Sequence, residues 1–236
     1  MQNIDRSEHN KMDRIRTSKK DGSAANRGEH RMMVRSLSSY KDIISLGSSC
    51  QTAYQLRRLQ LRTFAGPVDW NITQSAAGLI RLLEQRFQHF MDPGQVQMIG
   101  RAQLHYVIRD TAYQVDSYHD FPFTVPDHLW NQNYGQYKAK VDRRVQRFLH
   151  TLQSSSSLLL VRTATTKEQG EAIQKALHPM IKTANYLLLL VNDHEDQGRQ
   201  DVIYNRWGNQ HLHEAILPKG ADWRGEDRAW TQLFFG

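Results

Sequence analysis

The chain has 236 residues, of which 39 % are hydrophobic and 23 % charged, with five Trp, nine Tyr and eight Phe. This length and composition fit one globular domain with a well-buried core, or two small ones. The single cysteine excludes an internal disulfide and a multi-cysteine metal site, and it favours a reducing compartment.

Hydropathy argues against membrane insertion. The longest apolar run, residues 186–191, is long enough for a strand but not for a membrane-spanning helix. The first thirty residues lack the apolar core of a signal peptide. We therefore expect a soluble, cytoplasmic protein with no membrane partner.

The formal net charge of +7 is unevenly distributed. Residues 1–40 contain nine Lys or Arg and five Asp or Glu, so more than half of the excess lies there. Because residues 1–39 are polar and show no sustained hydrophobic period, we predict a disordered basic tail over that range. Residues 40–236 are only mildly basic and form the predicted folded domain. This charge does not favour a nucleic-acid partner.

A strand-to-helix junction holds the only cysteine. Residues 43–46 form a short β-branched apolar run that ends at Gly47, which is typical of a buried strand. From Cys50 onward the apolar period becomes helical, and either Ser48 or Ser49 can cap that helix. A helix N-terminus lowers a thiol pKa, so this is a suitable position for a nucleophile.

The later chain predicts an α/β fold. Two buried strands, residues 158–161 and 186–191, flank a helix at residues 166–181. A strand–helix–strand unit of this length implies parallel strands covered on both faces. We therefore predict one domain with a central, mostly parallel sheet and helices on both sides. The other expected elements are helices at residues 75–90, 127–153 and 223–235, a β-rich segment at 95–120, and strands at 202–207 and 212–217.

His119 is the candidate base for a Cys50 nucleophile. It lies at the predicted end of a strand, beside Asp120. A base of this kind needs a third group to orient it. Asp120 would point to the opposite side of a continuing strand, and Asn192 and Asp193 follow another strand, so spacing leaves these three open. A purely structural role for Cys50 or His119 is the competing interpretation.

Other residues near the junction are candidates for substrate binding. The turn of Gly47, Ser48 and Ser49 offers backbone amides. Asp69 and Trp70 are brought back towards the Cys50 helix by a Gly-Pro turn, and either wall the site or form a buried pair with Arg57 or Arg58. Arg162 follows a buried strand and could hold an anionic group or neutralise Asp193. A serine nucleophile is a weaker alternative, because no G-x-S-x-G elbow is present.

No cofactor or metal is expected. The clusters at residues 194–196 and 211–213 contain histidines, but no H-E-x-x-H motif occurs. The sequence also contains no phosphate loop and no G-x-G-x-x-G.

Four sequence blocks resemble a bacterial family of uncharacterised domains described as putative papain-like cysteine peptidases. They are D-I-I-S-L-G-S-S-C-x-x-A-x-x-L-R-R, G-P-V-D-W, Y-H-D-F and L-L-V-R-T. The resemblance runs from about residue 40 to the C-terminus. It implies the chain order Cys, His, then Asn or Asp, with Cys50 as nucleophile, His119 as base, and Asn192 or Asp193 as the third member. Such domains are also associated with surface-polysaccharide and natural-product genes.

The leading expectation is therefore a thiol-dependent hydrolase or acyltransferase that uses Cys50, His119 and Asp193. Its substrate would be a peptide, acyl or glycan-linked molecule. The first alternative is a non-catalytic module of the same fold that binds a glycan or an anion through Arg57, Arg162 and aromatic side chains. A second alternative is a glycosyl-modifying enzyme with Asp69 or Asp193 as acids.

Overall fold

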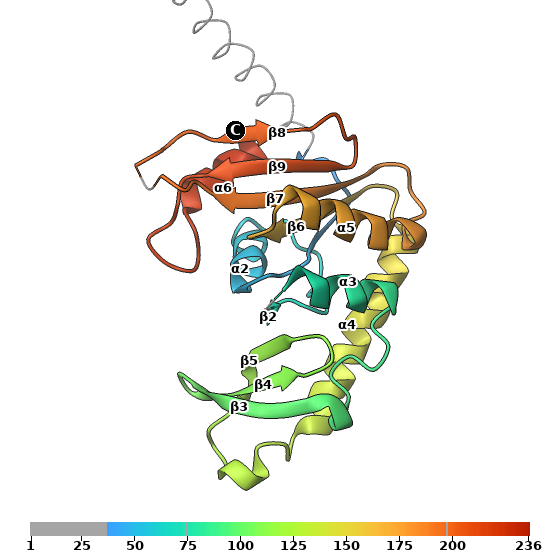
Figure 1. Cartoon of the computed structure of the whole chain (residues 1–236), viewed down its shortest axis with the longest axis vertical. Coiled ribbons are helices and arrows are strands. Elements are labelled where there is room, and N and C mark those ends of the chain that lie inside the picture. Colours follow the sequence, from blue (N-terminus) through green and yellow to red (C-terminus); the bar gives the residue numbers. More distant parts are fainter. Residues whose placement is uncertain (1–36, 74, 197) are drawn as a thin grey trace, which may run out of the picture.

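A computed structural model describes residues 37–73, 75–196 and 198–236, which form two β-sheets and the helices around them (Figure 1). Sheet A has the strand order β1-β6-β7-β9-β8, and sheet B has the order β2-β5-β4-β3. The strands of sheet A are β1 (Asp42–Ser45), β6 (Leu158–Thr163), β7 (Tyr186–Asp193), β8 (Ile203–Asn205) and β9 (Leu212–Leu217). Those of sheet B are β2 (Asn71–Thr73), β3 (Val96–Ala102), β4 (His105–Asp110) and β5 (Val115–Pro122). The helices are α2 (Cys50–Arg58), α3 (Ala76–Glu84), α4 (Tyr134–Ser154), α5 (Lys167–Leu177) and α6 (Asp227–Phe235), with short 3-10 turns η1 (Pro93–Gln95), η2 (Asp127–Leu129) and η3 (His178–Met180).

Sheet A is the predicted parallel sheet. Strands β1, β6, β7 and β9 run parallel, and β8 pairs antiparallel with β9 at the edge. All six residues of β6 are buried, because both faces of a parallel sheet are covered. Successive side chains of β6 point to opposite faces of the sheet, so Leu160 packs in the hydrophobic cluster on one face and Leu159 in the cluster on the other. Helix α5 covers the first side and helices α2 and α6 the second, which confirms helices on both faces.

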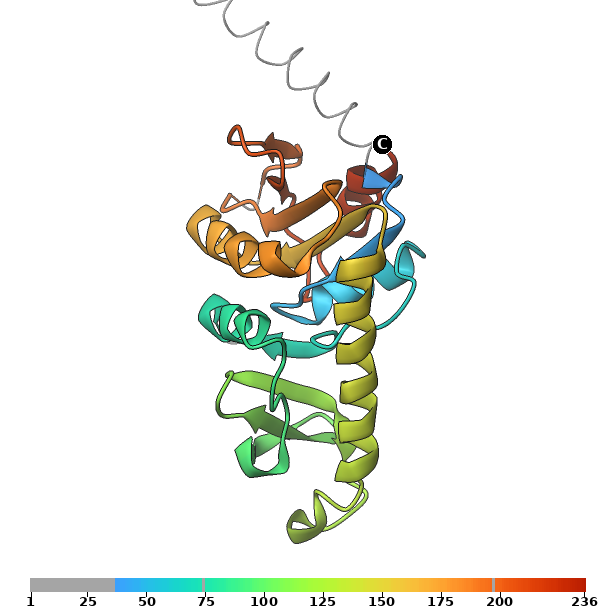
Figure 2. The ribbon, with the colours of Figure 1, turned by 90° about the vertical axis from the view of Figure 1, so that its right-hand side faces the viewer.

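Sheet B is a second sheet, whereas the sequence predicted a single central sheet. The β-rich segment at residues 95–120 forms three antiparallel strands, β3, β4 and β5, and β2 joins them beside β5. Helix α4 runs along both sheets (Figure 2). One hydrophobic cluster contains side chains from sheet B, α3, α4, α5 and sheet A, so the two sheets share a core and form a single domain.

Side-chain caps begin helices α2, α3 and α5, and at α2 the structure selects Ser49 from the two serines considered. Ser49 caps α2 by accepting a hydrogen bond from the backbone of Gln51, and Ser75 caps α3 in the same way. Thr166 and Gln169 form a complete capping box at the start of α5.

Helix boundaries agree less well with the predicted ranges. Helix α3 ends at Glu84 because Arg86 and Phe87 adopt positive φ angles, which direct the chain away from the helix. Phe87 then packs edge-on against Phe90 and Phe148. Helix α4 starts at Tyr134 after the separate turn η2, and α6 starts only at Asp227.

The predicted disordered tail lies outside the described residues, except for its last three positions. Of these, Leu37 is fully buried in the core on the α2 and α6 side of sheet A. Among the described residues, no helix is long and apolar enough to cross a membrane.

The contact between α3 and sheet B gives a test of this fold. A Cβ atom at Gly78 would lie 2.0 Å from the backbone oxygen of Tyr113, so Gly78→Ala must displace main chain. We expect this substitution to lower the free energy of unfolding by about 1–3 kcal/mol, the usual cost of overpacking. Gly135→Ala is the control, because nothing lies within 4 Å of a Cβ at that position of α4. Urea unfolding followed by circular dichroism measures both, and equal stability of the two variants would contradict the packing described here.

Candidate active site

A tight turn between β1 and α2 positions Cys50. Gly47 and Ser48 have φ angles of 71° and 81°, a left-handed conformation that favours glycine at the first position. A Cβ atom at Gly47 would also lie 3.3 Å from Val68. Ser49 then begins α2 as its N-cap, which leaves Cys50 as the first helical residue. The backbone N–H at that position has no partner within the helix.

Hydrogen bonds attach this turn to both sheets. The hydroxyl of Ser48 lies 2.6 Å from that of Thr163 at the end of β6. The backbone carbonyl of Ser48 accepts a hydrogen bond from the backbone N–H of Thr73 on β2. The backbone N–H of Gly47 donates to the hydroxyl of Ser45. The turn is therefore preorganised, which a site for developing negative charge requires.

The structure brings Cys50 and His119 together. The distance from Cys50 Sγ to His119 Nε2 is 3.6 Å, within hydrogen-bonding reach of a sulfur atom. The two residues are 69 positions apart in sequence and come from different sheets. Strand β5 has two extra residues opposite Val107, between the pairs Phe121–Tyr106 and Ser117–Ile108. Such a bulge breaks the regular alternation of side chains along the strand and changes their direction, and His119 lies within it.

Aromatic rings flank the imidazole of His119. The rings of Trp70 and His105 both meet it edge-on, with centroid distances of 6.2 and 6.1 Å. The neighbouring carboxylate of Asp120 is engaged elsewhere, because it accepts hydrogen bonds from Ser117 and from Lys140 of α4. The structure therefore aligns His119 by ring packing on two sides.

The electrostatics of this pair differ from the sequence-based expectation. Burial raises the pKa of the Cys50 thiol to about 11, with a further contribution from the negative charge of Asp69 and an opposing one from the Cys50 backbone N–H. Burial lowers the pKa of His119, and His105 adds to this shift while Asp120 opposes it. At neutral pH the resting pair is thus a thiol and a neutral imidazole. The helix N-terminus is outweighed by desolvation.

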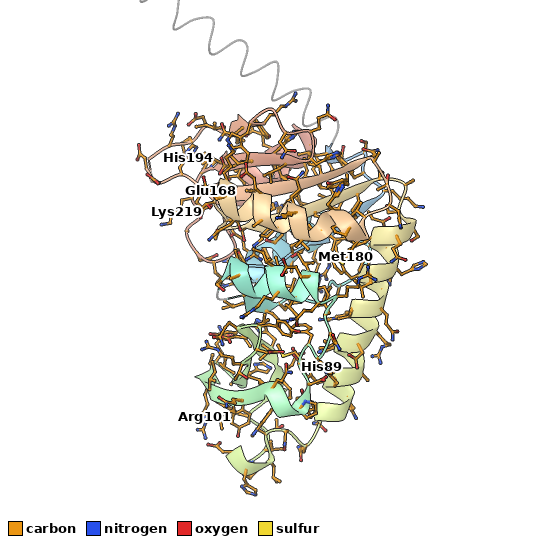
Figure 3. All side chains as sticks on the ribbon, turned by 45° about the vertical axis from the view of Figure 1, so that its right-hand side comes forward. His89, Arg101, Glu168, Met180, His194 and Lys219 are labelled. Atoms are coloured by element: carbon orange, nitrogen blue, oxygen red, sulfur yellow. The ribbon has the colours of Figure 1, made fainter. Side chains whose placement is uncertain are left out.

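A pocket opens beside the sulfur atom. Its volume is about 310 Å³. The β3–β4 hairpin forms one rim, and the loop between β9 and α6 forms the other. Arg101, next to the hairpin turn, and Lys219, on that loop, lie on the same side of the molecule (Figure 3). We call this cavity the Cys50 pocket; its lining residues are Ser49, Cys50, Ile72, Ala102, Gln103, Tyr118, His119 and Trp223.

Asp69 and Trp70 do not line the Cys50 pocket. Asp69 is buried and pairs with Arg62 at 2.5 Å, rather than with Arg57 or Arg58 as predicted. It also accepts a hydrogen bond from the backbone of Gly66, which closes the Gly-Pro turn. Asp69 is therefore structural in this arrangement. Trp70 follows with a φ angle of 66°, and that left-handed conformation accompanies its ring contact with His119.

Arg162 is buried at the same end of the sheets, with only 2 % of its surface exposed. Its guanidinium donates to the carbonyl of Leu46 at 2.7 Å and to the hydroxyls of Thr73 and Thr165, each at 3.0 Å. Burial lowers the pKa of Arg162 to about 10. It does not line the Cys50 pocket and neutralises no described carboxylate through a salt bridge, so it joins β1, β2 and the β6–α5 loop.

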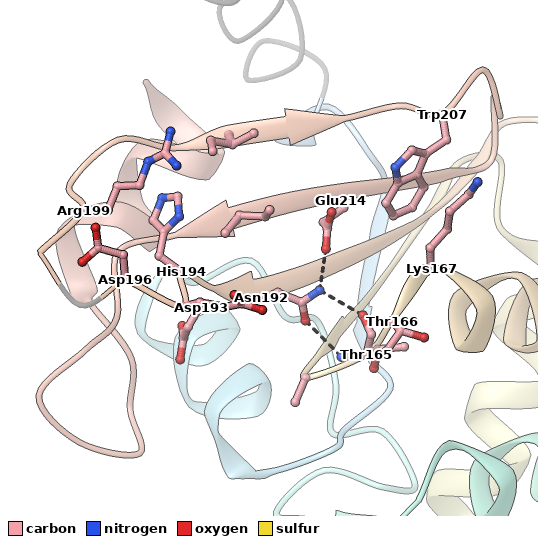
Figure 4. Close-up of a pocket in the computed structure, with 14 residues that line it drawn as sticks. Thr165, Thr166, Lys167, Asn192, Asp193, His194, Asp196, Arg199, Trp207 and Glu214 are labelled. Carbon is pink, nitrogen blue, oxygen red and sulfur yellow. Dashed lines mark hydrogen bonds between the residues drawn. The ribbon is translucent and has the colours of Figure 1, made fainter.

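The predicted third members lie in a different pocket from the Cys50–His119 pair. Asn192 and Asp193 line a cavity of about 670 Å³ near the start of α5, which shares no lining residue with the Cys50 pocket (Figure 4). The side chain of Asn192 is held by Thr165 and Glu214. The structure thus places neither Asn192 nor Asp193 in the pocket that contains His119.

Two other groups of predicted residues also lie apart from Cys50. Arg57 is in the last turn of α2, about 10 Å along the helix axis from Cys50. Two of the three histidines considered as metal ligands are engaged with backbone carbonyls: His194 donates to Asp201, and His211 to Tyr186. The Nδ1 atom of the third, His213, is buried and has no hydrogen-bond partner in the part of the chain that the structure describes. No group of three His, Cys, Asp or Glu side chains suited to a metal ion occurs among the described residues.

Sequence reasoning missed five of the residues that line the Cys50 pocket. Ala102 and Gln103 lie at a hairpin turn, and Ile72 belongs to a strand of only three residues. Segments this short show no hydrophobic period or motif that would mark them as part of a site. Trp223 was assigned to a helix. The flanking Gly220 and Gly225 could have indicated that Trp223 lies in a loop. Tyr118 is adjacent to His119 in sequence but was not predicted as a lining residue.

Comparison with known proteins is consistent with this geometry. Residues 41–192, which include Cys50 and His119, match a family described as putative papain-like cysteine peptidase. The chain is also similar to "Uncharacterized protein R408" of Acanthamoeba polyphaga mimivirus, a viral rather than a bacterial source. The two are 26 % identical over 172 residues, covering 63 % of this chain and 77 % of the relative. No solved structure matches the chain.

The raised thiol pKa gives a direct prediction. Because a group with a raised pKa loses its proton only at higher pH, alkylation of Cys50 by iodoacetamide should still accelerate above pH 9 in the folded protein. In urea-unfolded protein it should level off above the ordinary thiol pKa of about 8.5. Mass spectrometry measures both rates, and Cys50 is the only cysteine. A folded-state rate that levels off at or below pH 8 would contradict the burial effect.

Proposed function

The chain belongs to the family described as putative papain-like cysteine peptidases, and from this premise we propose that it is a thiol-dependent hydrolase or acyltransferase. Cys50 is the nucleophile and His119 the general base. The observation that carries the proposal is the 3.6 Å distance between Cys50 Sγ and His119 Nε2 at the wall of an open pocket. A nucleophile within hydrogen-bonding reach of a base is the geometry that covalent catalysis needs.

The first step forms a thioester. The neutral imidazole of His119 accepts the thiol proton on Nε2 while Sγ bonds to the carbonyl carbon, because a thiol of raised pKa does not ionise beforehand. The carbonyl oxygen becomes an oxyanion. It is stabilised by the Cys50 backbone N–H and by the amides of Ser48 and Ser49 in the preceding turn, since the Gly47 N–H already donates to Ser45. Collapse of this intermediate expels the leaving group, which takes the proton from Nε2.

The second step releases the acyl group. Water, or a hydroxyl or amine acceptor, loses a proton to Nε2 as its oxygen or nitrogen bonds to the thioester carbon. The carbon–sulfur bond then breaks, and the proton returns from Nε2 to the sulfur. Hydrolysis and transfer differ only in the acceptor, and the proposal covers both.

We assign orientation of His119 to the rings of Trp70 and His105 rather than to a carboxylate. Both rings contact the imidazole, whereas Asp120 is engaged with Ser117 and Lys140, and Asp193 lines the other pocket. The reaction thus runs on a Cys–His dyad. Of the residues predicted to bind substrate, Ser48 and Ser49 contribute backbone amides, whereas Gly47 shapes the turn and its own N–H donates to Ser45. Arg57, Asp69 and Arg162 do not line the Cys50 pocket and are assigned no contact with substrate.

Acyl-enzyme formation tests the proposal. Incubation with p-nitrophenyl esters and peptide thioesters, followed by acid quench and mass spectrometry, should show acylation of Cys50. Cys50→Ala should abolish it. His119→Ala should slow it by about 10²–10⁴-fold, the usual contribution of a general base.

Asp193→Asn is the matched control and should change the rate less than about threefold. Acylation that persists in Cys50→Ala would overturn the proposal. If no acyl donor reacts with the wild type and Cys50→Ala retains affinity for a glycan, the non-catalytic binding module is the better description.

The pH dependence follows from the lowered pKa of His119. Only the neutral imidazole acts as a base, so kcat/KM should fall as pH drops through that pKa. The acid limb should therefore lie below the ordinary histidine value of about 6.5. His105→Phe removes one contributor to the lowered pKa and should move this limb to higher pH. An unchanged limb in that variant would contradict the assignment of the base.

A further inference from the structure

The Cys50 pocket is uncharged. Among the described residues, no Lys, Arg, Asp or Glu lines it, whereas six charged side chains line the larger cavity that contains Asn192 and Asp193. The polar groups that face the Cys50 pocket belong to Ser49, Gln103, Tyr118 and the Cys50–His119 pair; the rest of the wall is apolar. At about 310 Å³ the cavity is at the lower end of ligand-pocket volumes, so it fits a single side chain or a short acyl group.

Trp223 is the largest apolar group on the pocket wall, and 56 % of it is exposed. Its ring meets Tyr54 of α2 edge-on, with a centroid distance of 5.5 Å. The β3–β4 hairpin carries a second exposed apolar residue, Leu104, which follows the lining residue Gln103 in sequence but does not itself line the pocket. An exposed tryptophan on the wall of a largely apolar pocket is typical of a binding site for apolar ligands.

The loop that carries Trp223 is held in place. A Cβ atom at Gly220 would lie 2.2 Å from the backbone of Gly225, so the two ends of the loop touch. Gly225 has a φ angle of 79° and packs against the side chain of Gln51. Gln55 of α2 donates to the carbonyl of Arg224 at 2.7 Å. Trp223 is therefore presented in a fixed position, which lowers the entropy cost of ligand binding.

We propose that the Cys50 pocket selects substrates with an aromatic or branched apolar group next to the reacting carbonyl, and that Trp223 is the residue that determines this specificity. The inference rests on the proposed function, because the pocket is defined by its position beside the Cys50–His119 pair. Trp223 lies outside residues 41–192, so this specificity belongs to the C-terminal part of the chain rather than to the segment that matches the family.

Three chloroacetamides test the inference: N-benzyl, N-carboxymethyl and N-(2-aminoethyl) chloroacetamide. Labelling of Cys50 is followed by mass spectrometry at pH 9, and each rate is divided by that of urea-unfolded protein to remove intrinsic reactivity. We expect the benzyl reagent to be favoured over both charged reagents by about tenfold or more, as burial of an aromatic ring implies.

Variants assign the preference to Trp223. Trp223→Ala should reduce it to about threefold or less, and Trp223→Phe should restore most of it. Leu129→Ala is the matched control, because Leu129 is an exposed apolar residue that does not line the pocket, and it should leave the preference intact.

Several outcomes would overturn the inference: equal rates for the three reagents, a preference that survives Trp223→Ala, or no labelling of folded protein by any reagent. Protection of Cys50 by millimolar maltotriose would also overturn it, in favour of a glycan. Failure of the proposed function is distinguishable. A benzyl preference without acyl-enzyme formation would leave an apolar binding site that has no catalysis, whereas acylation by charged and apolar donors alike would remove only the specificity.

Discussion

The buried guanidinium of Arg162 is the constraint on which the site depends. It bonds to the backbone at the end of β1, to Thr73 on β2 and to the loop that follows β6. Desolvating a charge is costly unless hydrogen bonds compensate, so these acceptors must stay in place around it. One side chain thereby fixes the carboxyl end of sheet A against sheet B. Cys50 follows the first of these attachment points and His119 lies on the strand beside the second, so their mutual distance depends on it.

The surroundings of the Cys50–His119 pair favour neutral forms of both side chains. The thiol and the imidazole both lie where burial disfavours charge, and the pocket beside them contains no ionised side chain among the described residues. An apolar substrate would exclude more water and strengthen every interaction with the developing oxyanion. In the proposed reaction, reactivity would therefore be linked to occupancy of the pocket, because bound substrate would compensate the charge separation between thiolate and imidazolium.

Local patterns in the sequence identified most of the elements but not their contacts. The run before Gly47 and the Thr166 cap are short-range features, so strand β1 and helix α5 could be predicted. The pairing of Cys50 with His119 was predicted from the place of His119 at a strand end and from the family resemblance, and sequence spacing alone does not give it. The partner of Asp69 could not be predicted, because the Gly-Pro turn decides which arginine it meets. Burial of the thiol is a property of the folded surroundings, which no local pattern encodes.

The connectivity of β1 has a consequence for the order of folding. Strand β1 is at the edge of sheet A, and apart from a single bridge between Ile43 and Arg62 its pairing in the described structure is with β6, more than a hundred residues later in the chain. Strands β3, β4 and β5 of sheet B are instead joined as hairpins between neighbouring segments, which form early because little loop entropy is lost. As the chain leaves the ribosome, the hairpins that carry His119 can assemble while strand β1, which precedes Cys50, still lacks β6. The proposed Cys50–His119 pair is thus completed late, after β6 has been synthesised.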